Sequence, residues 1–182
     1  MLAHKIKKMS KKIEHFFGKY RLNLELDIKW CTNKHHSYEW GYTYGPPMAV
    51  APLPNVRAVL DYAVTEMPAE KIFLGVPNYG YDWPLPFVQG TTKAQSISNQ
   101  RAIELALYYG VAIQYDETAQ APFFRYTAGD GVEHEVWFED ARSAEAKWRL
   151  IAEYGFRGAG VWNLMRPFSQ IWLVLDSLYD VG

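Results

Sequence analysis

The sequence has a single cysteine, Cys31, among 182 residues. A disulfide within the chain is therefore excluded, and the redox compartment stays undecided. The sequence also lacks any apolar run near the ~20 residues that a membrane-spanning helix needs, so no membrane partner is expected. Residues 1–12 carry lysines without the apolar stretch of a secretion signal, so no signal peptide is seen.

Metal ligands and nucleic-acid signatures are also scarce. Cys31, His35, His36 and His134 could bind a metal ion, but their spacing lacks the paired second half of a structural zinc site. We therefore expect no metal and no other cofactor. Residues 1–36 hold nine Lys and Arg against three Asp and Glu, whereas the remainder holds 10 against 17. No nucleic-acid-binding motif accompanies this basic leader, so no nucleic-acid partner is expected.

Aromatic side chains, in contrast, are abundant. They make up 16% of the chain, with seven Trp and thirteen Tyr. Flat aromatic faces suit the C–H faces of sugars, and Tyr and Trp add a polar group. A large aromatic core would produce the same composition, so composition leaves both interpretations open. Hydrophobic residues at 49% and charged residues at 21% are ordinary for a globular domain with one core.

The hydrophobic pattern predicts helices alternating with short strands, which is typical of α/β architecture. Helices are expected at 55–67, 98–109 and 140–154, and strands at 22–30, 72–76, 111–115, 123–127, 133–138 and 158–164. Asn55, Ser98 and either Asp140 or Ser143 are expected to cap the helices. Residues 79–92 are rich in aromatics, Gly and Pro and predict a loop. The triplet at 129–131, Gly-Asp-Gly, predicts a hairpin.

Three segments in this order resemble glycoside hydrolase family 18. Tyr38-Glu39-Trp40-Gly41 resembles the Met-x-Tyr-Asp signature that ends the sixth barrel strand. Residues 72–80 resemble the seventh strand and its Pro-x-Tyr-Gly exit. Residues 138–143, with 158–162, resemble the closing helix and the eighth strand. In detail, the segments are similar to the spore-germination and cortex-lytic subgroup of the family.

The resemblance covers residues 37–182 and implies a partial TIM (β/α)8 barrel. About the last three β/α units would be present, with a small α+β insertion at about 93–138 before the last strand. A complete barrel needs about 250 residues, so about five units are not recognisable here. Residues 1–36 form a leader unlike the family, and we hypothesise a truncated or frame-shifted reading of the gene. Open barrel edges would allow self-association.

The family's chemistry, by resemblance, is substrate-assisted hydrolysis of N-acetylglucosamine polymers, either peptidoglycan of the cell wall or spore cortex, or chitin. A glutamic acid protonates the glycosidic oxygen, and the substrate's own N-acetyl carbonyl attacks the anomeric carbon. The resemblance assigns Tyr38 as the hydroxyl donor to that carbonyl and Glu39 to the place of the family's Asp. The polysaccharide would be the partner, and the location would be the cell wall or spore envelope.

Four further aromatic residues are candidate sugar contacts by the same resemblance. Trp162 would be the stacking platform at the floor of the pocket, and Tyr79, Trp40 and Trp83 would line the groove. They lie at or after strand ends, where barrels of this kind place their active sites. Packing in a core is the alternative for each of them.

The catalytic acid itself is missing from the recognisable motifs. The family's Asp-x-x-Asp-x-Asp-x-Glu signature is not found. Residues 24–29 echo it faintly, but Lys29 stands where the acid would be and has no readily given proton at neutral pH. We interpret the echo as chance similarity, so enzyme activity is uncertain and the chain is expected to be inactive by itself. A non-catalytic carbohydrate-binding remnant and a non-functional fragment are the alternatives. Asp140 and Arg142 are expected to form a helix cap and an ion pair.

Overall fold

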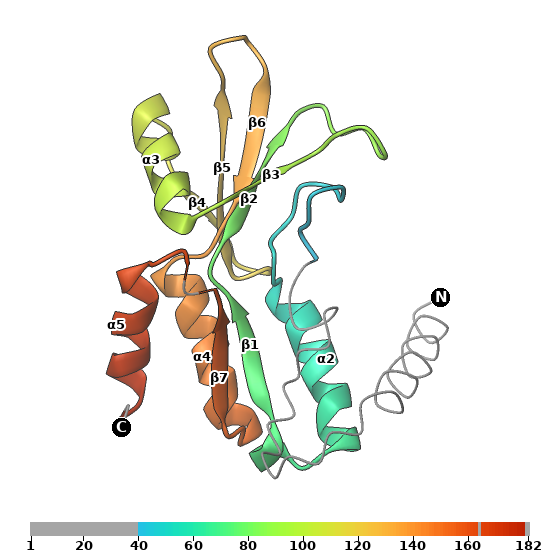
Figure 1. Cartoon of the computed structure of the whole chain (residues 1–182), viewed down its shortest axis with the longest axis vertical. Coiled ribbons are helices and arrows are strands. Elements are labelled where there is room, and N and C mark those ends of the chain that lie inside the picture. The colour runs from blue at the N-terminus through green and yellow to red at the C-terminus, as the bar shows by residue number, and fades with distance from the viewer. Residues whose placement is uncertain (1–39, 164, 181–182) are drawn as a thin grey trace.

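A computed structural model describes residues 40–163 and 165–180 of the chain. The described strands form two sheets, one with two strands and one with five. Together with the helices they make an α/β arrangement, as predicted (Figure 1). The expected leader and strand at 22–30 lie outside the described residues, as do Tyr38 and Glu39.

The smaller sheet is a parallel pair surrounded by helices. Strand β1 (Phe73–Pro77) lies beside β7 (Gly158–Trp162), with the first and last residues of the two strands in register. Helix α2 (Leu53–Glu66) lies on one side of the pair, and α4 (Ala141–Tyr154) and α5 (Ser169–Leu178) lie on the other (Figure 1). A parallel pair needs such a long connection between its strands, and here that connection contains the whole second sheet.

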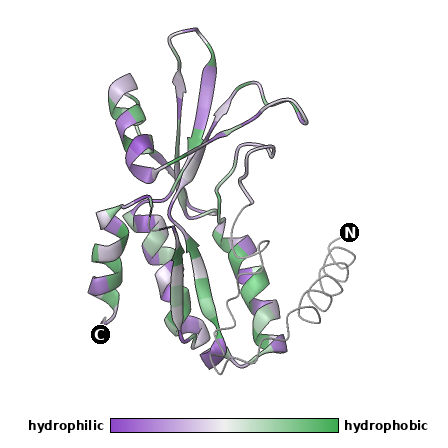
Figure 2. Cartoon of the chain, in the orientation of Figure 1, coloured by the Kyte–Doolittle hydropathy of each residue, from purple (hydrophilic) through white to green (hydrophobic). Residues whose placement is uncertain are grey.

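The main core fills the space between these helices and β1. Leu60 of α2, Leu74 of β1 and Trp148 of α4 are all less than 2% exposed. Each buried side chain of this size stabilises the fold by about 1.5–3 kcal/mol. The Trp148 indole N–H also donates to the Ile171 carbonyl at 3.3 Å, which ties α4 to α5. The hydrophobic colouring of β1 in Figure 2 reflects this burial.

The larger sheet is antiparallel, in the order β3-β2-β6-β5-β4. Its strands are β2 (Gly80–Pro84), β3 (Gln95–Ile97), β4 (Gln114–Asp116), β5 (Ala121–Thr127) and β6 (Glu133–Trp137). Strands β5 and β6 pair through the predicted hairpin, which is confirmed. Gly131 adopts a φ of +85° in its turn, a conformation that suits glycine. The tip of β6 is hydrophilic (Figure 2).

Local capping chemistry places the remaining helices. Helix α3 (Asn99–Tyr109) begins where the Ser98 hydroxyl accepts the Arg101 N–H at 3.1 Å, as predicted. Helix α4 begins at Asp140, whose carboxylate accepts the Ser143 N–H at 3.0 Å and pairs with the Arg142 guanidinium at 2.7 Å. The expected cap and ion pair are therefore confirmed. A short 3-10 turn, η1 (Ala69–Lys71), connects α2 to β1.

Three expectations about these elements were wrong. Residues 80–84, expected in a loop, form the strand β2 between β3 and β6, because Gly80 lets the backbone approach Trp137 closely. Helix α2 begins at Leu53 rather than after Asn55, since proline suits the first turn of a helix. The strand expected at 111–115 runs over 114–116 instead, where it pairs with β5. Within the described ranges, every helix is too short or too polar to cross a membrane.

Candidate functional site

The carboxyl ends of β1 and β7 meet at one edge of the parallel pair. Pro77 lies opposite Trp162, and the Asn78 N–H donates to the Trp162 carbonyl at 2.7 Å. Trp162, the last residue of β7, is 59% exposed although it ends a strand of the core region. Trp162 therefore lies exposed at the carboxyl ends of the strands, the edge at which α/β sheets bind their ligands.

Asn78 connects this edge to the antiparallel part of the molecule. Its amide N–H donates to the Arg166 carbonyl at 2.5 Å, and its amide oxygen accepts from Asn99 at 3.1 Å. The Asn99 oxygen accepts in turn from the Glu139 backbone N–H at 3.0 Å. Both asparagines are 1% exposed. Because buried amides are costly unless hydrogen-bonded, this chain of bonds fixes the edge rigidly. Our sequence reasoning missed it, and the polar residue directly after a buried strand was its one signal.

Tyr79 lies beneath Arg166 at this edge. Tyr79 is 5% exposed and packs edge-on against Tyr81 with ring centres 5.7 Å apart. The Arg166 guanidinium lies 5.8 Å from the centre of the Tyr79 ring, and its Nη1 donates to the Ser96 hydroxyl and the Ile97 carbonyl, each at 2.9 Å. Tyr79 is therefore buried beneath the Arg166 guanidinium, and little of it faces solvent.

Trp40 and Trp83, the other two residues expected in the groove, differ in how deeply they are buried. Trp40 is half-buried, packs against the main core, and donates its backbone N–H to the Val50 carbonyl at 3.0 Å. Trp83 is fully buried and does not line a groove. The reason is that its indole N–H finds a partner inside, the Gly45 carbonyl at 2.7 Å, while its ring packs against Tyr81. Tyr38 and Glu39 cannot be placed, since they lie outside the described residues.

His134, a candidate metal ligand in the sequence, belongs to a polar cluster within the antiparallel sheet. The Asp82 carboxylate accepts from the Tyr126 hydroxyl at 2.7 Å and lies 2.7 Å from Nδ1 of His134. Burial, followed by the bond to Asp82, raises the pKa of the Tyr126 hydroxyl. No three His, Cys, Asp or Glu side chains gather around a potential metal position in residues 40–163 and 165–180. The cluster satisfies buried polar groups.

Glu139 is a buried carboxyl group whose raised pKa makes it worth testing as a proton donor. Burial raises its pKa, and the Lys147 ammonium opposes that shift. Lys147 Nζ lies 2.8 Å from Glu139 Oε2, and both residues are 1% exposed. The second oxygen, Oε1, has no hydrogen-bond partner among the described residues. A carboxyl group buried this completely cannot protonate a glycan bound at the surface, so we assign the pair to the core.

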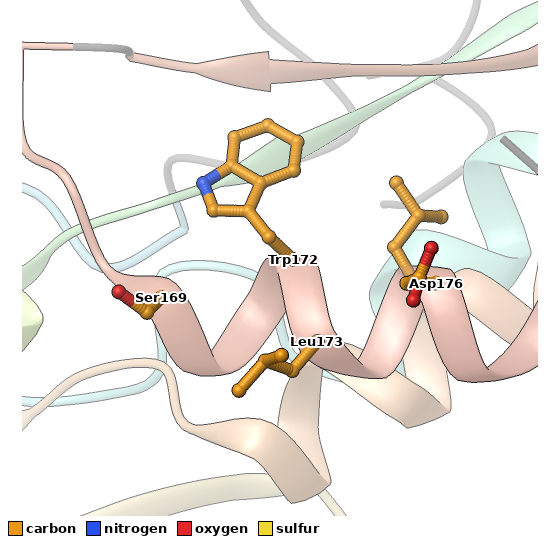
Figure 3. A pocket seen from close by; sticks show the side chains of 5 residues that line it. Ser169, Trp172, Leu173 and Asp176 are labelled. Atoms are coloured by element: carbon orange, nitrogen blue, oxygen red, sulfur yellow. The ribbon is translucent and has the colours of Figure 1, made fainter. Parts of the chain in front are cut away.

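Two hollows open on the surface near α5. One, of about 480 Å³, is lined by Ser169, Trp172, Leu173, Leu175 and Asp176. Figure 3 shows the Trp172 indole and Leu173 projecting from opposite sides of this helix. The other, of about 540 Å³, lies between residues 95–101 and residues 165–167, which follow Trp162 in the chain. The second hollow is therefore lined by the loop that follows the strand of the exposed Trp162.

Comparison with known proteins gives a consistent result. The family model described as glycosyl hydrolases family 18 matches residues 25–166. The cortical fragment-lytic enzyme of Bacillus subtilis is 54% identical over 145 residues, which are 80% of this chain and 34% of that enzyme. The Bacillus cereus spore cortex-lytic enzyme SleL has a crystal structure that matches with a TM-score of 0.77 at 46% identity, covering 80% of this chain and 34% of that one.

A more distant chitinase shares the same fold. The crystal structure of the Chromobacterium violaceum chitinase matches with a TM-score of 0.72 at 33% identity, over 78% of this chain and 43% of that chain. The chain spans about a third of the length of the cortical fragment-lytic enzymes that it matches.

Proposed function

Because the chain belongs to glycoside hydrolase family 18, we propose that it forms part of a (β/α)8 barrel that acts on N-acetylglucosamine polymers. In this proposal β1 and β7 are the seventh and eighth barrel strands, and the described helices around them belong to about the last three β/α units. Strands β3 to β6 of the antiparallel sheet, with α3, are the small insertion at about 93–138 before the last strand, and β2 pairs with it from outside those bounds. The parallel pairing of β1 with β7 across that sheet supports this assignment.

The substrate class we propose is peptidoglycan of the cell wall or spore cortex, with chitin as the second member of the same class. Relatives that share about half of their aligned residues with this chain are named for lysis of cortical fragments. A location in the cell wall or spore envelope follows from that substrate.

The observation that carries the proposal is the exposed indole of Trp162 at the end of β7. Aromatic faces at strand ends stack on sugar rings, so Trp162 is the proposed platform. Trp40 is proposed to line the groove, as the resemblance implies, and Tyr79 lies beneath the Arg166 guanidinium. Tyr38 and Glu39 keep the roles that the resemblance gives them, which are to hold and orient the substrate's acetamido group.

Catalysis requires a proton donor, and the sequence contains no recognisable acid signature. Glu139 does not replace it, since it is buried against Lys147. We therefore propose that a polypeptide of this sequence binds the glycan without cleaving it, which favours a carbohydrate-binding role as the second candidate. Within the part of the chain that the structure describes, β1 and β7 pair only with each other. Their outer edges are a route to self-association.

Binding to insoluble peptidoglycan tests the proposal. We expect Trp162→Ala to lose most of the binding, since it removes the aromatic face proposed to stack on the sugar ring. The matched control is Trp172→Ala, which removes an exposed indole from α5 instead. Equal binding by Trp162→Ala and the parent chain would refute the platform, and hydrolysis of a chromogenic N-acetylglucosamine oligomer by the parent chain would refute the missing acid.

A further inference from the structure

The hollow of about 540 Å³ that Arg166 lines is a groove between two parts of the fold. One wall is the edge strand β3 with the beginning of α3, and the other is the loop of residues 165–167 between β7 and α5. The carbonyls of Trp162 and Arg166 both accept hydrogen bonds from Asn78, so the groove and the indole belong to the same edge of the fold.

The groove carries positive charge without a carboxylate in its lining. Arg101 and Arg166 line it, and no Asp or Glu does. Arg166 forms no ion pair with any carboxylate in residues 40–163 and 165–180, since its Nη1 bonds only to the Ser96 hydroxyl and the Ile97 carbonyl. Arg101 has one long contact, 3.8 Å to Glu104, between side chains that are both more than half exposed.

Contacts with Asn78 and Tyr79 hold Arg166 in place. Its carbonyl accepts the Asn78 amide at 2.5 Å, and its guanidinium lies over the ring of Tyr79. With one amino group bonded to β3, the remaining N–H groups of the guanidinium form no hydrogen bond to another described residue. A planar guanidinium fixed in this way can bind a carboxylate through two parallel hydrogen bonds at little entropic cost.

We propose that this groove is a carboxylate-recognising subsite, with Arg166 as its main contact and Arg101 as its second charge. The inference rests on the proposed function and names the substrate within it. Chitin presents only neutral acetamido and hydroxyl groups, whereas peptidoglycan presents carboxylates on the lactyl or peptide substituents of alternate sugars. The groove therefore selects acidic glycans of the peptidoglycan type over chitin.

Calorimetric titration of the chain with three soluble probes tests this. The probes are chitotetraose, a peptidoglycan tetrasaccharide with free lactyl carboxylates, and the same tetrasaccharide carrying its peptides. We expect the parent chain to prefer at least one acidic probe over chitotetraose by about tenfold, a preference that weakens with added salt. The lactyl and peptide probes then distinguish the two sources of the carboxylate.

Variants assign that preference to the groove. Arg166→Gln is expected to reduce the acidic-to-neutral affinity ratio about five- to tenfold, and Arg101→Gln about two- to threefold, since exposed charges contribute less. Arg149→Gln, which removes an exposed charge on α4, is the control and is expected to keep the parent ratio. Equal affinities for acidic and neutral probes, or a parent-like ratio in Arg166→Gln, overturn the subsite. If the parent chain binds none of the three probes, the proposed function is refuted together with the subsite. Binding without a preference for acidic probes refutes the subsite alone.

Discussion

Replacing Lys147 by methionine tests the account of the core most sharply. The variant keeps a side chain of similar length but leaves the Glu139 carboxylate without its charge partner. In the parent chain the two charged atoms lie 2.8 Å apart, and both residues are 1% exposed. At an effective dielectric constant of ~20, charges at this separation attract by about 6 kcal/mol. The cost of removing both charges from water offsets most of that attraction.

Losing one partner of such a pair typically costs about 3–5 kcal/mol. That is a large part of the roughly 5–15 kcal/mol by which a native domain is stable. The oxygen Oε1 of Glu139 already has no hydrogen-bond partner among the described residues, so the Ser143 side chain is the group that still favours the charged carboxylate in the variant. Replacing both residues, by Glu139→Leu with Lys147→Met, removes the uncompensated charge and is expected to recover most of the loss.

The measurement is urea unfolding of the parent chain and both variants at pH 5 and pH 8. Burial raises the pKa of Glu139, and removal of Lys147 takes away the charge that opposes this shift. A raised pKa means that the stability is present at low pH and is lost as the pH rises through the folded-state pKa. The deficit of Lys147→Met should therefore be smaller at pH 5. A loss below about 1 kcal/mol, or a double variant no more stable than the single one, contradicts the reasoning.

Two further predictions concern the antiparallel part. Gly80→Ala should destabilise the chain by about 1–3 kcal/mol, because the new Cβ would overlap the Trp137 carbonyl; Gly129→Ala, which meets open space, should change the urea midpoint little. Burial raises the pKa of Tyr115 to about 12 from its ordinary 10.0, so its contribution to stability is complete below pH 10 and lost as the pH rises through about 12. Tyrosinate absorbance during alkaline titration should show this late step.

Local chemistry explains why much of the fold could be predicted. Ser98 caps α3 with its own hydroxyl, and Gly110 ends that helix with a φ of +64°, so both ends are encoded within a few residues. The hairpin between β5 and β6 likewise depends on its Gly-Asp-Gly turn. Such signals need no knowledge of distant segments.

Strand β2 could not be predicted in this way, because its existence depends on partners far along the chain. Its aromatic, Gly and Pro residues are typical of a loop, yet Tyr81 pairs with Trp137 in the sheet. The burial of Trp83 could not be predicted for the same reason, because its indole N–H donates to the Gly45 carbonyl, 38 residues earlier in the chain. In the candidate site, the position of Trp162 at a strand end followed from pattern and resemblance. The polar Asn78 directly after a buried strand was a local signal, but its partner Asn99 lies 21 residues along the chain and could not be predicted from it.

The contact between Asn78 and Asn99 joins the edge that carries Trp162 to the antiparallel part of the molecule. The backbone and side chain of Asn78 hold the loop from Trp162 to Arg166, while Asn99 starts α3 and also accepts from the backbone where β6 ends. A barrel can keep its sugar platform at the strand ends while an insertion changes which substituents fit beside it. The buried bonds fix the distance between the end of β7 and the insertion, so the proposed subsite at their junction would meet a substituent at a set position along the glycan. In the proposed subsite, Arg166 comes from the loop after β7 and Arg101 from α3 of the insertion, so selectivity arises where the two parts meet, whereas stacking resides in Trp162 of the parallel pair.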